Sequence, residues 1–181
     1  MEQKFNSALA ILPAISITGQ LVLNRASIGS LILLAGLIFA VELAFFFIPG
    51  VSLSSLLIAM AAMHYGFVTT FVISIIPIVA AHFLLIRKPT VFIADILTII
   101  PMILFGAYFG KTIIGFSGFW GWSILGALFS IVKWGIALPV GYMLGGSIPK
   151  RIRELFLEPA GSFFIFKLNF LFLFLFSGFV V

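Results

Sequence analysis

Residues 28–48 read IGSLILLAGLIFAVELAFFFI, an apolar run with a single charge at Glu42 that ends before Pro49 and Gly50. A helix that crosses a bilayer needs about 20 consecutive, mostly apolar residues. The strands of a membrane barrel instead alternate apolar and polar residues, and this run does not alternate. A helix also satisfies its own backbone hydrogen bonds in lipid, where water is absent. The stretch therefore predicts a membrane-spanning α-helix.

The rest of the chain shares this character. Its 181 residues are 63% hydrophobic and 8% charged, with a mean hydropathy of +1.34. Soluble domains are about 45–50% apolar and about 25% charged, so lipid must cover most of this surface. The predicted fold is an all-α transmembrane helical bundle of about six spans, with five to seven allowed, in the cell membrane.

The predicted organisation has two parts. Residues 1–27 form a polar start followed by a short apolar helix, either interfacial or spanning, and residues 28–181 form the bundle. Ser27 precedes the first long span and is a suitable N-cap. The further apolar helices are expected at 52–65, 67–86, 91–110, 122–146 and 160–181, with a turn rich in glycine and aromatic residues at 110–122.

Two groups of basic residues indicate the orientation. Arg87 and Lys88 form one, and Lys150, Arg151 and Arg153 form the other. Positively charged loops stay on the cytoplasmic side. Two predicted spans separate the groups, so both are expected on that side.

The second basic group belongs to a charged connection at residues 149–159. We interpret it as a short amphipathic helix on the inner membrane surface, with Glu158 facing water. A solvated loop is the alternative. Pro159 is expected to begin the last span, because proline interrupts a helix but is accepted in its first turn.

Several classes of chemistry are excluded or lack support. The chain has no cysteine, which excludes disulfides, thiolate metal sites and cysteine nucleophiles. It has no phosphate-binding loop, nucleophile elbow or paired histidines at metal-ligand spacing. We therefore predict no catalytic residues, no metal and no cofactor. The net charge of +5 reflects membrane topology, and no basic run indicates nucleic-acid binding.

Glu42 and Lys133 are the ionisable residues deepest in their predicted spans. Charged groups at the centre of a membrane cost at least about 2.5–3.5 kcal/mol on insertion scales and by default mark a function. Because their charges are opposite, we predict that Glu42 and Lys133 point into the bundle and line one cavity. A solute-binding site and a purely structural ion pair remain alternatives.

Two further residues are candidate ligands. Asp95 lies one turn into the span at 91–110, where it contacts a ligand, caps its own helix or pairs with Arg87 or Lys88. His64 ends the short helix before Tyr65, at an interface or against a ligand. His82 is predicted to be a polar residue that is hydrogen-bonded within the protein. Lys111 and Lys167 are predicted to be anchors whose ammonium groups reach the membrane surface.

Small residues indicate where helices pack closely. Gly36, Ala40 and Ala44 recur every four residues and form one smooth face, which is expected to contact another helix of this chain or of a partner. The other small-residue candidates for helix packing are Gly106, Gly110, Gly141 and Gly145.

The organisation of residues 28–146 resembles the substrate-binding S components of energy-coupling-factor transporters and the related rod-shape-determining membrane protein family. The resemblance rests on Ala40-x-x-x-Ala44 in the first long span, the short helix after Pro49, and His64 with Gly66 at the start of the next span. It implies that Ala40 and Ala44 dock a transmembrane coupling subunit. The apolar stretch at 8–23 is additional to that pattern.

These observations predict a small-solute binding or transport subunit that relies on partner membrane subunits for energy, since the chain has no nucleotide-binding motif. The alternative is a non-catalytic scaffold or accessory subunit of a larger membrane complex. An intramembrane enzyme is the third reading. The expected partners are membrane lipid, membrane protein subunits and a small solute.

Overall fold

The computed structural model describes residues 27–45, 53–86, 89–145 and 148–175. These residues form α-helices and one short 3₁₀-helix, with no strand in the described ranges. The all-α prediction is confirmed for this part of the chain. The elements are α2 (Ile28–Phe45), α3 (Leu53–Leu84), α4 (Pro89–Ser117), η1 (Gly118–Trp120), α5 (Gly121–Met143) and α6 (Ile148–Leu175).

Three stretches of the described helices are long and apolar enough to cross a membrane. They are Leu53–Leu84, Phe92–Ser117 and Gly121–Met143, and Ile28–Ala44 is a shorter apolar helix. The chain is therefore a helical membrane protein with three candidate spans in its described part, rather than the expected six. The predicted apolar helix at 8–23 lies outside the described residues.

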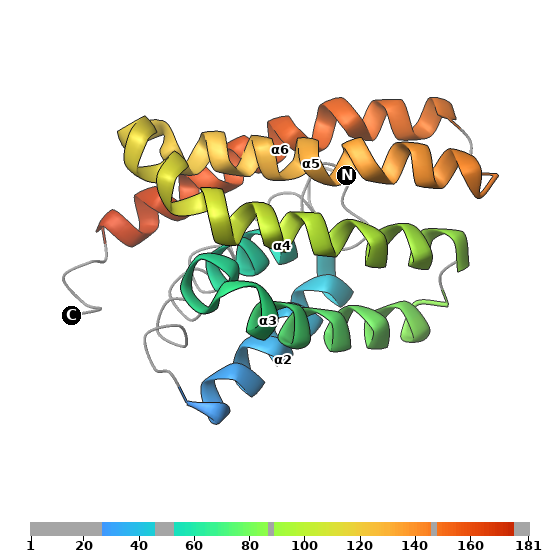
Figure 1. The fold of residues 1–181 in the computed structure, drawn as a ribbon, viewed down its shortest axis with the longest axis horizontal. Coiled ribbons are helices and arrows are strands. Elements are labelled where there is room, and N and C mark those ends of the chain that lie inside the picture. The colour runs from blue at the N-terminus through green and yellow to red at the C-terminus, as the bar shows by residue number, and fades with distance from the viewer. Residues whose placement is uncertain (1–26, 46–52, 87–88, 146–147, 176–181) are drawn as a thin grey trace.

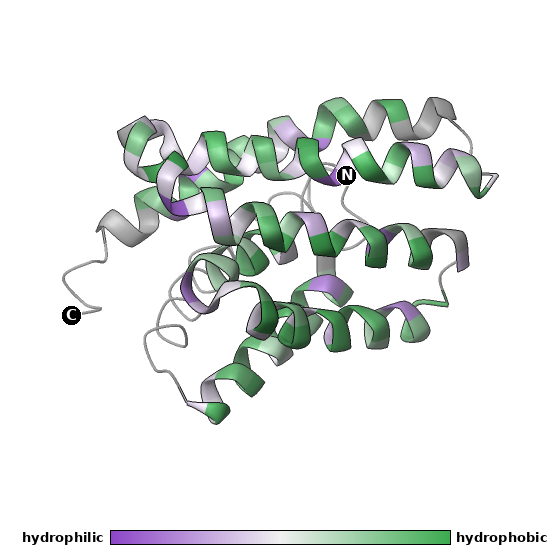
Figure 2. Cartoon of the chain, viewed as in Figure 1, coloured by the Kyte–Doolittle hydropathy of each residue, from purple (hydrophilic) through white to green (hydrophobic). Residues whose placement is uncertain are grey.

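Hydrophobic residues make up most of each described helix (Figure 2), and many of the large ones are exposed. Phe116 is 94% exposed, Ile86 90% and Met143 83%. A surface with so many large exposed apolar side chains is unsuited to water and suited to lipid.

Consecutive helices are neighbours in the bundle (Figure 1). Helix α4 lies between α3 and α5, and α6 runs back along α5, so that α5 and α6 lie on the far side of the molecule from α2. The described residues on either side of the two basic segments lie at one end of the bundle, and η1 lies at the other. Residues 87–88 and the side chains of Lys150, Arg151 and Arg153 are not described, and their cytoplasmic placement remains a prediction.

Helix α2 begins with the cap that the sequence predicts. The backbone N–H of Ser30 donates to Oγ of Ser27 at 3.2 Å, and the backbone N–H of Ser27 donates to Oγ of Ser30 at 3.0 Å. This reciprocal pair satisfies two backbone donors at the start of the helix, as a capping box does.

Helix α3 has a kink at Gly66, where φ is 75° and ψ is −169°. This is the break expected between the helices at 52–65 and 67–86. A positive φ is readily available to glycine and strained for other residues. The kink lets the first half of α3 take a different direction from the second.

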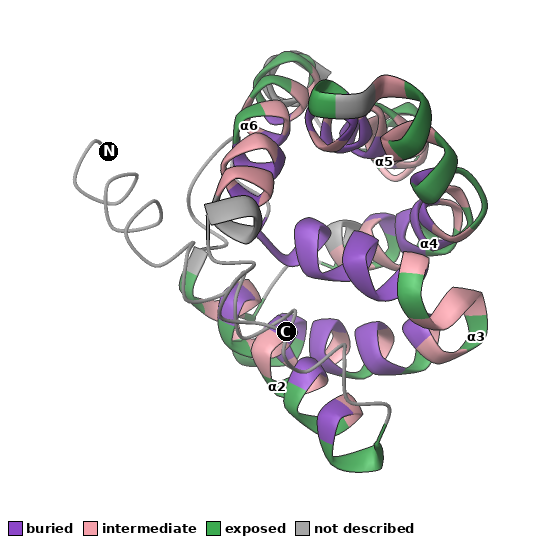
Figure 3. Ribbon diagram, turned by 90° about the vertical axis from the view of Figure 1, so that its left-hand side faces the viewer, coloured by how far each residue is buried: buried purple, intermediate pink, exposed green. Residues whose placement is uncertain are grey.

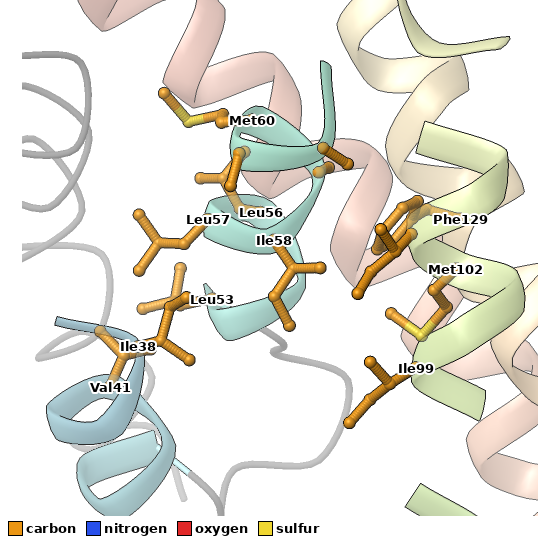
Figure 4. Packing of buried hydrophobic residues seen from close by; sticks show 14 of the residues in the cluster. Ile38, Val41, Leu53, Leu56, Leu57, Ile58, Met60, Ile99, Met102 and Phe129 are labelled. Carbon is orange, nitrogen blue, oxygen red and sulfur yellow. The ribbon is translucent and has the colours of Figure 1, made fainter. Parts of the chain in front are cut away.

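The first half of α3 forms the centre of the bundle. Every residue of 53–62 is buried, so this short helix has no lipid-facing side (Figure 3). Its apolar side chains lie between α2 on one side and α4 and α5 on the other (Figure 4). The residues of this cluster that Figure 4 labels on the flanking helices are Ile38, Val41, Ile99, Met102 and Phe129.

The sequence predicts a charged connection at 149–159 and a separate span at 160–181, but the structure has a single helix, α6, that continues from one into the other. It is one helix, Ile148–Leu175, with Pro159 inside. A proline removes one backbone donor, but membrane helices tolerate this where neighbouring helices support the segment. Contacts of Glu158 and Ser162 with α5 supply that support. The predicted turn at 110–122 is likewise shorter, because α4 continues to Ser117.

Candidate functional site

A buried carboxylate joins α5 to α6. The ammonium of Lys133 donates to Oε1 of Glu158 at 2.6 Å, and the indole Nε1 of Trp134 donates to Oε2 of the same carboxylate at 2.7 Å. Glu158 is 5% exposed. Adjacent residues of α5 thus provide a hydrogen bond to each oxygen of one carboxylate, which charge-assisted bonds stabilise strongly.

The water-facing position predicted for Glu158 is wrong, and so is the choice of Glu42 as the contact partner of Lys133. Both errors have one cause, the expectation that Pro159 starts a new helix. Because α6 passes through Pro159 and packs antiparallel on α5, Glu158 comes to lie beside Lys133.

The sequence holds a signal that points to this pairing. Ser130 and Trp134 are four residues apart on α5, and Glu158 and Ser162 are four apart on α6, so each pair lies on one helix face. The hydroxyl of Ser130 donates to that of Ser162 at 2.6 Å. Two polar stripes of equal spacing therefore meet across the interface.

Charges from two further helices act on Lys133. Glu158 attracts its ammonium most strongly, and Asp95 of α4 and Glu42 of α2 contribute smaller electrostatic attractions. Glu158 makes the direct contact with Lys133, and the shared cavity of Glu42 and Lys133 stays a prediction.

Asp95 also contacts α3. Its Oδ2 lies 2.9 Å from Nε2 of His82, and His82 is buried whereas Asp95 is 30% exposed. The predicted partners Arg87 and Lys88 lie outside the described residues. Asp95 is thus in direct contact with an imidazole and in electrostatic contact with Lys133.

A cavity of about 260 Å³ lies next to this pair. Its lining residues come from the end of α3 and the start of α4 and are mostly apolar: His82, Phe83, Pro89 and Phe92. The imidazole of His82 meets the ring of Phe92 edge-on, with centroids 5.2 Å apart.

His64 takes no part in this polar region in the described structure. It is exposed, two residues before the kink at Gly66, and its imidazole meets the ring of Tyr65 edge-on at 4.7 Å. The structure places it at the surface of the bundle.

Of the predicted packing residues on α4, on α5 and just after α5, Gly106, Gly110 and Gly141 are buried in the bundle and Gly145 is not. On α4, Gly106 and Gly110 lie against α3: a Cβ at Gly106 would lie 3.1 Å from Cβ of Ala62, and one at Gly110 would lie 2.6 Å from Cγ of Met63. Gly141 is buried on α5. Gly145 makes no close contact and instead has φ of 78° just after α5, because the chain turns there.

The small-residue face of α2 is open. Gly36, Ala40 and Ala44 are exposed, and a Cβ at Gly36 would have no atom within 4 Å. Within the described residues, no other helix therefore uses this face for close packing.

A close contact that the prediction missed lies between α5 and α6. A Cβ at Gly126 would lie 2.6 Å from Cγ of Phe166 and 2.7 Å from the carbonyl oxygen of Ser162. Gly126 has no small residue four positions away except Ser130, and it was not recognised as a packing residue.

The polar region combines three carboxylates with one ammonium and one imidazole. In the described part of the chain, no group of three or more histidine or carboxylate side chains has the arrangement of a metal centre. The direct contacts of the polar region include the Lys133–Glu158–Trp134 network and the His82–Asp95 pair.

Comparison of the chain with protein-family models, with curated proteins and with solved structures finds no match. The geometry of the polar region is therefore the basis for a functional assignment.

Proposed function

We propose that the chain is a small-solute binding or transport subunit of the cell membrane, and that its solute is a small cation or a protonated amine. The observation that supports this proposal is the buried ion pair of Lys133 and Glu158, whose ammonium is attracted more weakly by Asp95 of α4 and Glu42 of α2. The proposed site lies between Glu42, Asp95 and the Lys133–Glu158 pair.

The charge balance favours a cation over an anion. Three described carboxylates, those of Glu42, Asp95 and Glu158, attract one ammonium, that of Lys133. Carboxylate oxygens are ligands for cations and repel anions.

The proposal includes a partner subunit. The open face of Gly36, Ala40 and Ala44 allows a second membrane helix to approach the backbone of α2 closely. The resemblance to S components supports the same face. A coupling subunit docked there would provide the energy that this chain, without a nucleotide-binding motif, does not supply.

The second candidate is a non-catalytic scaffold or accessory subunit. Both oxygens of Glu158 are already hydrogen-bonded, by Lys133 and Trp134. A fully satisfied buried network fixes how α5 packs on α6 without any ligand. In this case the ion pair is structural and the region binds no solute.

Cation titration distinguishes the two candidates. The chain has three tryptophans, so the Trp120→Phe, Trp122→Phe variant leaves Trp134, whose indole bonds Glu158, as the fluorescent reporter. The protein in lipid nanodiscs is titrated with sodium, potassium and methylammonium chloride, with choline chloride as the ionic-strength control. A cation site gives a saturable change in fluorescence with at least one of the three.

Removing one carboxylate charge should weaken this response. We expect Glu42→Gln and Asp95→Asn each to raise the apparent Kd about tenfold, which corresponds to about 1.4 kcal/mol. Lys111→Gln is the matched control, because Lys111 is an exposed lysine near the opposite end of α4. A response identical to that of choline for all three cations would refute the cation site and favour the scaffold.

Co-purification tests the partner. Recovery of an ATPase pair with a membrane coupling protein supports the transport subunit, and recovery of a large enzyme complex supports the accessory subunit.

A further inference from the structure

Two buried polar side chains between α5 and α6 lack hydrogen-bond partners. Asn169 is completely buried, and within the described structure neither its Oδ1 nor its Nδ2 has a partner. Ser123 is also completely buried, and its Oγ has none. Buried polar groups in proteins are almost always hydrogen-bonded, so each exception requires a physical explanation.

The helix register places these two side chains at the same level. Ser130 bonds Ser162, and four residues further along each antiparallel helix Trp134 bonds Glu158. On α5, Ser123 comes seven residues before Ser130 and lies on the same helix face. On α6, which runs antiparallel, Asn169 comes seven residues after Ser162. Seven residues make about two helical turns, so Ser123 and Asn169 face each other across the interface.

Aromatic residues enclose this level. Phe166 is completely buried next to Gly126 on one side. On the other side, the ammonium of Lys167 donates to the carbonyl oxygen of Phe119 at 2.5 Å and lies over the Phe119 ring, 2.9 Å from its centroid. The ring of Phe170 meets that of Phe119 edge-on.

Asn169, and not Ser123, sets the requirement for a partner. A helical serine can donate to a carbonyl three or four residues earlier, and the carbonyl of Phe119, which accepts from Lys167, has a second lone pair. Asn169 has two donors and an acceptor. Thr70 and Ser74 are also buried without partners, but as hydroxyls they can turn to carbonyls of their own helix, so they indicate no site.

We propose that Ser123 and Asn169 form a buried binding site for a small neutral molecule that both donates and accepts hydrogen bonds. The molecule accepts from Nδ2 of Asn169, donates to its Oδ1 and shares a hydrogen bond with Oγ of Ser123. The ligand is neutral because neither side chain is charged and the ammonium of Lys167 is held by Phe119. Water and a solute with a hydroxyl or amide group share this chemistry.

This site is separate from the proposed cation site. Asn169 and Glu158 are eleven residues apart on α6, which is about 16 Å along a helix. The failure of one proposal therefore leaves the other standing.

Selective labelling makes the site directly observable. The chain has three asparagines, Asn6, Asn24 and Asn169, so ¹⁵N-asparagine labelling gives three side-chain amide signals. The protein is measured in lipid nanodiscs or detergent micelles, and Asn169→Leu identifies the Asn169 signal by its loss. We expect cross-relaxation between the Asn169 amide protons and water if water fills the site.

A solute is distinguished from water by adding acetamide or ethylene glycol. If the site accepts such a molecule, the probe displaces the water signal from the Asn169 amide and raises the Tm of the wild type but not of Asn169→Leu. If water alone fits, the probes change neither. Both results support a neutral hydrogen-bonding guest.

The melting temperature of two variants can contradict the proposal. A filled site predicts that Asn169→Leu lowers the Tm, because the guest loses its partner, whereas an empty site predicts a rise, because an unsatisfied amide is removed. Ser123→Ala deletes one oxygen and should fold; it should weaken the amide–water signal, with the partnered Ser130→Ala as control. An Asn169 amide that contacts neither water nor probe, together with no effect of Ser123→Ala on the Tm, would overturn the proposal.

Discussion

The contact between Lys133 and Glu158 makes a quantitative prediction about folding. Their side chains are 21% and 7% exposed, respectively. Removing one partner of a buried ion pair costs about 3–5 kcal/mol, because a buried charge is left uncompensated. Lys133→Met leaves the more deeply buried charge, so we expect it to destabilise the protein more than Glu158→Leu, which leaves an ammonium that partly reaches the surface.

The double replacement should behave differently. In Lys133→Met, Glu158→Leu no charge remains unpaired, and apolar residues of similar volume often replace a buried pair without loss of stability. The indole N–H of Trp134 then lacks its acceptor, which costs about 1–3 kcal/mol. The double variant should therefore unfold with a free energy within about 3 kcal/mol of the wild type and above that of Lys133→Met.

Glu158→Gln separates the contact with Lys133 from the contact with Trp134. Its amide oxygen can still accept from Trp134, while its NH₂ group replaces the oxygen that accepts from Lys133, so the loss relative to the wild type reports the Lys133 contact, charge and hydrogen bond together. Unfolding free energies of all four variants are measured by denaturant titration in detergent micelles and combined in a double-mutant cycle. A coupling energy below about 0.5 kcal/mol, or a double variant less stable than both single variants, would refute the assignment of this contact as a buried ion pair.

Three further predictions concern packing, partners and topology. Gly126→Leu should destabilise the protein by about 1–3 kcal/mol, because its Cβ would lie 2.6 Å from a ring carbon of α6, whereas Gly135→Ala, with no atom within 4 Å, should be neutral or stabilising in the same unfolding assay. Ala40→Leu should leave the Tm of the isolated chain unchanged, since Ala40 is exposed, but should reduce the partner recovered by co-purification; normal recovery would contradict the proposed docking face. Single cysteines at Arg87 and Lys150 should react with a membrane-impermeant thiol reagent from the same side of the membrane, and labelling from opposite sides would exclude the predicted topology.

Local rules account for the features that were predicted correctly. The N-cap at Ser27 and the helix break at Gly66 depend on a few neighbouring residues, and both occur as expected. The all-helical fold follows from long apolar runs that do not alternate. Each of these features is determined within one or two turns of the chain.

The features that were missed depend on how distant helices meet. Glu158 lies in the most charged part of the sequence, so a single-helix argument places it in water. Its burial follows from the antiparallel register of α5 and α6, which a sequence pattern alone does not show until the polar residues of both helices are compared. Pro159 added to the error, because proline signals a helix start in water but is tolerated within a supported membrane helix.

The bundle uses two different kinds of helix interface. Between α3 and α4, Ala62 and Gly106 bring the backbones close, and a polar contact, between His82 and Asp95, lies where α3 ends and α4 begins. Between α5 and α6, a hydroxyl pair and a buried carboxylate network are added to the close contact at Gly126. Apolar side chains gain little by leaving lipid for another apolar surface, so small residues and polar contacts determine which helices associate.

This difference assigns different roles to the two interfaces. Small residues allow close approach but specify register weakly, because one apolar contact can replace another. A carboxylate that must meet both an ammonium and an indole permits one register only, and a one-residue slip would leave several buried groups unpaired. The α5–α6 interface therefore fixes how α6 aligns with α5, and in the proposed neutral site this alignment brings Asn169 to the level of Ser123.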